Sequence, residues 1–189
     1  MNVTRPTPTT ATDIITLAAM KEFLRVDHND EDATITAMMD AAVVHCSDVT
    51  NRHFTADSAG TFYLPYFRPA ALAFGPVTNI QSVQYYDTAG DLQTLNTALW
   101  WVEARDNQVW RIFFRDTPDL EDYNATPVIV NCRVGKVASP NIKHALKMIV
   151  AHWYETRRAV VVGSGIGSSE VPMAVNALLN PERLETAWQ

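Results

Sequence analysis

Apolar residues recur at helical spacing in two stretches near the start of the chain. In residues 17–24 one face is apolar, and Thr16 stands where it can cap the first turn. A longer stripe follows a polar break and runs over residues 30–51. Its members are Ile35, Met38, Met39, Ala42, Cys46 and Val49. The spacing predicts a short helix followed by a long one.

Between residues 61 and 136 the helical period is replaced by short runs rich in Val, Ile, Tyr, Trp and Phe. The runs are TFYLPYF, IQSVQYYD, LWWVEA, QVWRIFF and VIVNCRV. Turn-forming stretches separate them, and in DTAGD the position of Gly90 suits a hairpin. We therefore expect an antiparallel β segment of roughly four to six strands.

Helical spacing returns after Ser139 and Pro140, where proline suits a first helical turn, and it continues to about residue 158. Residues 1–13, rich in Thr and Pro, are expected to form a flexible arm, and residues 159–171 a flexible loop. Residues 172–189 are expected to form a short C-terminal helix and a tail. The predicted fold class is α+β, with a mainly helical bundle core over 14–158 and an inserted antiparallel β-rich segment at about 61–136.

The composition restricts the class of function. The net charge is −6, and residues 139–189, at +1, are the only part with a basic excess. This is not the basic patch that a DNA-binding domain needs to neutralise phosphates. Two distant cysteines do not form a disulfide framework, which favours a reducing compartment. No leader and no long uncharged run are evident, so we expect neither secretion nor a membrane location.

The residues that could support catalysis or metal binding do not converge in the sequence. His45 and Cys46 are adjacent and point about 100° apart on a helix, while His144 and His152 lie more than two turns apart. The acidic group at 27–32 lacks the spacing of a calcium loop. Cys46 lies on the apolar stripe of the long helix and Cys132 alternates with Val130 and Val134, so both are expected in the core. We therefore predict no enzyme activity, no metal and no cofactor.

The glycines of GSGIG at 163–167 do not form a phosphate-binding motif. They follow a helix instead of a strand, and no lysine accompanies them. The loop is either a segment that orders on assembly or a plain flexible connector, and the sequence does not decide between the two.

Four strings in one order carry a resemblance to a known family. They are ITLAAMKEFLRVDHNDEDATITAMMDAA, FGPVTNIQSVQYYDTAGDLQTL, PNIKHALKMIVAHWYETRRAVVVG and EVPMAVNALLNPERL. They are distributed from Ile15 to Leu184. The chain resembles the phage head–tail connector (head-completion adaptor) family, also found in gene transfer agents. One departure is Glu182, which stands where the family has an aromatic residue after the proline.

The resemblance implies a structural adaptor in the neck of a virion, assembled in the host bacterial cytoplasm. It would form a dodecameric ring beneath the portal protein, connect the DNA-filled head to the tail, and contact a stopper or tail-completion protein on its other face. DNA would pass through the lumen without sequence-specific binding, and an acidic lumen would suit that passage because it repels phosphate.

The apolar C-terminal segment is the predicted portal contact, because it carries more apolar surface than a loose tail usually shows. Its residues are Val175, Leu178, Leu179, Arg183, Leu184 and Trp188. The alternative is that they close the protein's own core. Two other functions stay open: a stopper or tail-completion protein of the same neck region, and a small-molecule-binding domain that uses the aromatic β segment.

Overall fold

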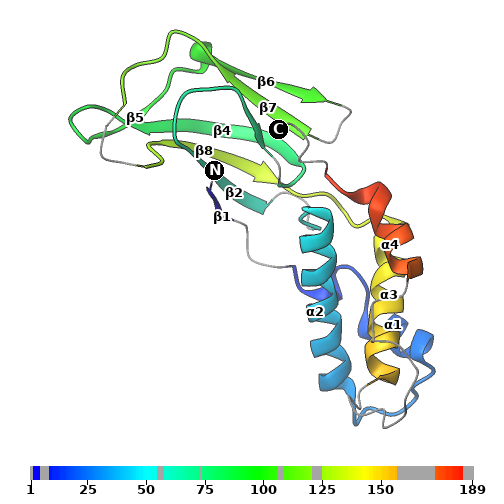
Figure 1. Cartoon of the computed structure of the whole chain (residues 1–189). Coiled ribbons are helices and arrows are strands. Elements are labelled where there is room, and N and C mark those ends of the chain that lie inside the picture. The colour runs from blue at the N-terminus through cyan, green and yellow to red at the C-terminus, as the bar shows by residue number, and fades with distance from the viewer. Residues whose placement is uncertain are drawn as a thin grey trace, which may run out of the picture. The chain divides into compact units, whose positions relative to one another are not determined.

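The chain divides into two compact units, each built from segments that lie far apart in the sequence (Figure 1). The β unit comprises residues 1–7, 51–136 and 184–189, and the helical unit comprises residues 8–50 and 137–183. The structure is a computed structural model. It describes residues 2–4, 9–54, 58–72, 74–105, 109–120, 125–156 and 173–184. The predicted loop at 159–171 lies outside these ranges.

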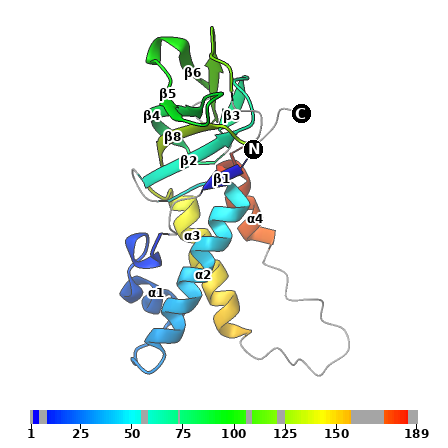
Figure 2. The same ribbon diagram turned by 90° about the vertical axis from the view of Figure 1, so that its left-hand side faces the viewer.

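The helical unit contains four α-helices and two short 3₁₀ turns among its described residues. The helices are α1 (Leu17–Leu24), α2 (Asp32–Thr50), α3 (Pro140–Glu155) and α4 (Met173–Leu179), and the turns are η1 (Ala11–Asp13) and η3 (Asn180–Glu182). Helix α3 packs against both α2 and α4, and α1 contacts α2 and α3 (Figure 2). The four helices therefore match the segments that the periodicity predicted.

Side chains cap two of the predicted helix starts, at Thr16 as expected and also at Ser139. The Thr16 hydroxyl accepts a hydrogen bond from the Ala19 backbone N–H at 3.2 Å, and the Ser139 hydroxyl accepts one from Ile142 N–H at 3.3 Å. Each cap satisfies a backbone donor that the first turn of a helix leaves without a partner. Pro140 opens α3, where its missing N–H costs nothing.

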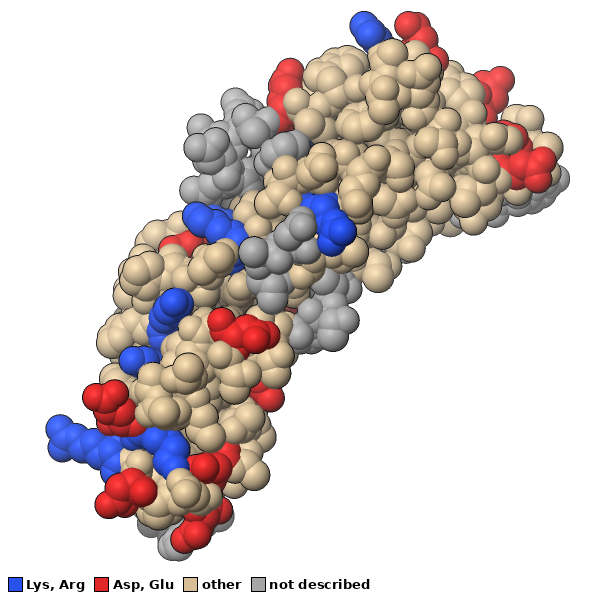
Figure 3. Space-filling model, turned by 180° about the vertical axis from the view of Figure 1, so that it is seen from behind, with Lys and Arg blue, Asp and Glu red and all other residues tan. Residues whose placement is uncertain are grey.

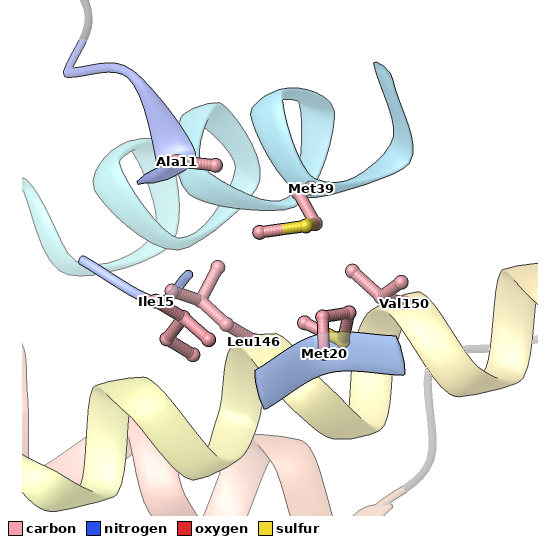
Figure 4. Close-up of a pocket in the computed structure, with 6 residues that line it drawn as sticks. All are labelled: Ala11, Ile15, Met20, Met39, Leu146 and Val150. Atoms are coloured by element: carbon pink, nitrogen blue, oxygen red, sulfur yellow. The ribbon is translucent and has the colours of Figure 1, made fainter. Parts of the chain in front are cut away.

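The apolar faces of α1, α2 and α3 meet in a dense core. Met20, Met39, Leu146 and Val150 surround a small apolar space, shown in Figure 4, that has no room for a water-sized molecule. Ala11, from the segment predicted as a flexible arm, also lines this space and is buried. Close packing of this kind leaves no binding cavity at this position.

The β unit contains two antiparallel sheets. Its strands are β1 (Asn2–Thr4), β2 (Ser58–Leu64), β3 (Ala70–Leu72), β4 (Val77–Tyr86), β5 (Leu92–Thr94), β6 (Trp100–Arg105), β7 (Val109–Phe114) and β8 (Val128–Val134). The five-stranded sheet has the order β1-β2-β8-β4-β5, and the three-stranded sheet has the order β3-β7-β6. The segment predicted to hold about four to six strands has seven among its described residues, because β3 and β5 are only three residues long and carry too little alternation to be recognised.

The two sheets share one hydrophobic core. Phe62 and Val130 from the larger sheet and Leu72 and Ile112 from the smaller one belong to the same buried cluster. The sequence of strand β8 explains how side chains reach this core, since its buried and half-buried residues alternate along its whole length. Alternation places one row of side chains toward the core and the other row outside.

The prediction of a mainly helical bundle core is therefore wrong. The β segment is not an excursion from a mainly helical bundle core: it forms a compact unit with a hydrophobic core of its own, and the helices form another unit. The chain is α+β with a sheet-rich body. The prediction failed because the apolar faces of the helices indicated how they pack, but the strand pattern did not show that two sheets cover each other.

Candidate interaction surfaces

The C-terminal residues predicted to contact the portal are mostly buried where the structure describes them. Val175 and Leu179 of α4 are 0% exposed, and Leu184 is 3% exposed. Leu178 is half-buried and Arg183 is exposed. Trp188 lies outside the described residues. Among the described residues of the predicted set, Leu178 and Arg183 are therefore the accessible ones. The portal contact itself stays a prediction.

Polar contacts fix the end of this segment to the rest of the helical unit. The Ser139 hydroxyl, which caps α3, donates a hydrogen bond to Glu182 Oε1 at 2.6 Å. Arg183 Nε donates to the backbone oxygen of Val49, near the end of α2, at 2.9 Å. Glu182, which departs from the family pattern, therefore holds a helix cap in this chain.

The outer face of the five-stranded sheet carries an uncharged polar network. Asn131 lies at its centre, on the side of β8 opposite the buried Cys132. Its amide nitrogen donates to Gln84 Oε1 at 2.8 Å and to Ser82 Oγ at 3.2 Å, and its oxygen accepts from the Thr61 hydroxyl at 3.2 Å. The alternation in VIVNCRV could have revealed this face, since it places an amide opposite the core.

One edge of that sheet is formed by the hairpin of β4 and β5. Asp87 organises the turn: its Oδ1 accepts from the backbone N–H groups of Ala89 and Asp91, each at 3.0 Å, and its Oδ2 accepts from Gln93 Nε2 at 2.9 Å. The Gln93 contact and the backbone donors lower the pKa of Asp87. These bonds stabilise the charged carboxylate and hold β5 in place.

An aromatic pair lies on the outer face of the three-stranded sheet. Trp101 and Phe113 are cross-strand partners, with ring centroids 5.4 Å apart and planes at 9°. Trp101 remains 42% exposed. In Figure 3, the visible face of the β unit is largely uncharged, with charged groups at its margins. The exposed aromatic pair is suited to contact with protein.

The acidic residues at the start of α2 are occupied by internal contacts. Asp32 pairs with Lys21 at 2.7 Å, and Lys21 also donates to Asn29 at 2.6 Å. Glu31 accepts a short hydrogen bond from the Tyr154 hydroxyl of α3. These side chains join α1, α2 and α3 to one another.

Burial makes both cysteines unreactive, and no metal site is found among the described residues. Desolvation raises the pKa of Cys46 and of Cys132 to about 12 each. Their predicted core positions are confirmed, at 0% and 1% exposed. In the described part of the chain, no three His, Cys, Asp or Glu side chains converge as metal ligands. No helix in those ranges is long and apolar enough to cross a membrane.

Alkylation tests the state of the two thiols. At about pH 8, a pKa near 12 leaves roughly a thousandfold less thiolate than the ordinary value of 9.0 would. We expect iodoacetamide to leave Cys46 and Cys132 unmodified in the native protein and to modify both after denaturation, as measured by intact mass. Rapid modification of either thiol in the native protein would contradict the buried placement.

The fold is similar to that of chains in gene transfer agent (GTA) particles. A chain in the neck of an empty GTA particle, computed with C6 symmetry, matches with a TM-score of 0.73 and 18% identity. A chain in the virion of a native GTA particle matches with 0.74 and 19%, and one in the neck of a native GTA particle, computed with C12 symmetry, with 0.69 and 16%. Each match covers 100% of this chain and 98% of the other.

Comparisons based on the sequence alone found no relative. No family model matches the chain, and no curated protein matches it significantly. At identities of this level, the agreement lies in the fold, and it extends over both units. The chain therefore has, along its whole length, the fold of chains found in GTA particles and their necks, which confirms the resemblance to the head–tail connector family that its motifs carry.

Proposed function

We propose that this chain is a non-enzymatic structural adaptor in the neck of a tailed bacteriophage or a related particle. It binds under the portal protein as a ring and connects the DNA-filled head to the tail. The observation that carries the proposal is the match of the entire chain to chains from particle necks, with almost no residue left over on either side. Unreactive cysteines and the absence of a metal cluster among the described residues support a structural role.

A ring of copies is supported by the symmetry of the particles in which similar chains lie, C6 in one case and C12 in another. Rotational symmetry requires each copy to offer two different surfaces, one to each neighbour. The net charge of −6 suits a channel through which DNA slides, since negative side chains repel phosphates and give no grip on sequence. Assembly would take place in the bacterial cytoplasm, with the portal on one face and a stopper or tail-completion protein on the other.

The C-terminal segment is the proposed portal contact, with Leu178, Arg183 and Trp188 as the residues that meet the partner. Val175, Leu179 and Leu184 hold the segment to the folded chain, because they are buried. Leu178 and Arg183 are accessible and can meet a partner without local unfolding. Trp188 is included because tryptophan is frequent among residues that anchor interfaces.

A substitution at the C-terminus tests this contact. Mixed with portal rings of the same particle, the wild-type chain should give a ring-on-ring complex in electron micrographs. Trp188→Ala should weaken portal binding roughly 30-fold, since an anchoring aromatic residue contributes about 2 kcal/mol. Thr186→Ala is the matched control and should bind like wild type. Single substitutions are preferable to truncation after Asn180, which would also remove the buried Leu184 and the contact of Arg183 with α2.

The result separates the adaptor from its alternatives. Equal binding by Trp188→Ala and wild type would remove Trp188 from the interface. A chain that does not bind portal but binds a tail-terminating protein would be a stopper or tail-completion protein. A chain that binds neither protein would leave a small-molecule-binding domain as the remaining alternative.

A further inference from the structure

Strand β5 presents free backbone groups along its outer side. Leu95 N–H donates to Val83 O at 2.8 Å, and Asp87 N–H donates to Asp91 O at 3.0 Å. In an antiparallel ladder these contacts alternate, so the backbone groups of Leu92 and Thr94, the residues between them, point away from β4. No described strand pairs with that side, and all three residues of β5 are exposed, Leu92 to 48%.

The three residues of β5 are uncharged, and hydrogen bonds of the preceding turn hold the strand. The three hydrogen bonds to Asp87 fix the turn and the Gln93 side chain, so β5 keeps strand geometry although its residues bury little. Its sequence, Leu-Gln-Thr, lacks the lysine, proline or inward-pointing charge that usually protects an edge strand from pairing. An ordered, unprotected edge is a template for a further strand.

The opposite edge of the same sheet is a strand of the same length and character. Strand β1, Asn2–Thr4, pairs with β2 on one side and is the last strand on the other. It too contains no charged residue. The five-stranded sheet thus runs between two short uncharged edges, and Figure 2 shows its strands following one another from β5 to β1.

We propose that β5 of one copy pairs with β1 of the next copy, so that the five-stranded sheets continue around the ring. This inference rests on the ring of the proposed function and adds the contact between neighbouring copies that would form it. A rotational ring needs two different surfaces per copy, and the two edges supply them from one sheet.

Because the four neighbouring pairs in the order β1-β2-β8-β4-β5 are all antiparallel, β1 and β5 run in the same direction. A small rotation about an axis along the strands preserves that direction, so the junction should be parallel.

The dimensions of such a ring are reasonable. Strands about 4.8 Å apart give each copy a repeat of roughly 24 Å along the sheet. Twelve such repeats would close a ring about 90 Å across, which leaves room for a central duplex inside the sheets. Each junction is short, so a single contact is weak, and the ring should close only when many copies are held together on the portal.

A proline substitution tests the junction. Thr94→Pro removes the outward N–H and keeps the bonds of β5 to β4, whereas Thr94→Val changes only the side chain and serves as the control. We expect wild type and Thr94→Val to form full rings on portal, counted by mass photometry and electron microscopy. Thr94→Pro should bind with an apparent affinity roughly tenfold or more lower and leave incomplete rings. Circular dichroism should show that all three proteins are folded.

Cross-linking provides a second test that does not depend on the proline variant folding. In portal-bound rings, a Thr4→Cys/Leu92→Cys double variant treated with a short bis-maleimide should give a ladder of covalent multimers, and each single variant should not. The buried native cysteines do not interfere. Complete rings with Thr94→Pro, no ladder, or dimers from Leu92→Cys alone would overturn the β5–β1 junction. If the wild-type chain bound no portal and formed no ring, the proposed function would fail together with the junction.

Discussion

Replacing Phe62 with alanine is expected to lower the free energy of unfolding of the β unit by about 3–5 kcal/mol. Phe62 is 0% exposed and lies on β2, opposite Val3 of β1 and Val130 of β8. Removal of its ring takes contacts from the core that both sheets share, and the surrounding strands cannot close the cavity because their register is fixed on both sides.

The matched control is the next residue along the strand. Tyr63 points to the outer face and is half-buried, so Tyr63→Ala should cost about 1 kcal/mol. Urea unfolding followed by tryptophan fluorescence measures both variants, since Trp100 and Trp101 lie in the same unit. If Phe62→Ala were no more destabilising than Tyr63→Ala, the shared core of the two sheets would be wrong.

Gly75→Ala is expected to destabilise the β unit by about 2–3 kcal/mol. Gly75 has φ +152°, and a Cβ added there would lie 2.5 Å from the backbone nitrogen of Val77. The chain cannot move away easily, because Gly75 N–H donates to Asn51 O at 3.1 Å and its carbonyl accepts from His53 N–H at 2.8 Å. The substitution would therefore cause a backbone clash and also disturb these hydrogen bonds.

Gly90→Ala separates conformational strain from that clash. Gly90 also has a positive φ, 84°, but it lies in the exposed turn between β4 and β5. Its substitution should cost about 1–2 kcal/mol through backbone strain alone. Thermal or urea unfolding of the two variants compares the costs, and a smaller loss for Gly75→Ala than for Gly90→Ala would contradict the close approach to Val77.

The sequence predicted the parts of the molecule that depend on local periodicity and on local hydrogen bonds. The helices follow from stripes of apolar residues, and the cap at Thr16 follows from a side chain that can bond the first turn. The buried position of Cys46 follows from the apolar stripe of its helix, and that of Cys132 follows from alternation with apolar neighbours in its strand. The family resemblance likewise came from short strings, and the fold comparison confirmed it.

Only the tertiary structure decided what covers each apolar face. The same alternation in β8 is compatible with a sheet that packs on helices or on another sheet, and the second sheet was found only when Leu72 and Ile112 met Phe62 in space. The apolar C-terminal segment was equally ambiguous, and the structure buries Val175 and Leu179 in the helical unit. The free edge at β5 could not be predicted from the sequence either, because a three-residue strand is too short to show a periodicity. Its neighbours in the sheet also come from distant parts of the chain. A pattern of hydrophobic residues states which side chains avoid water, and the partner that excludes the water is fixed only by the folded chain.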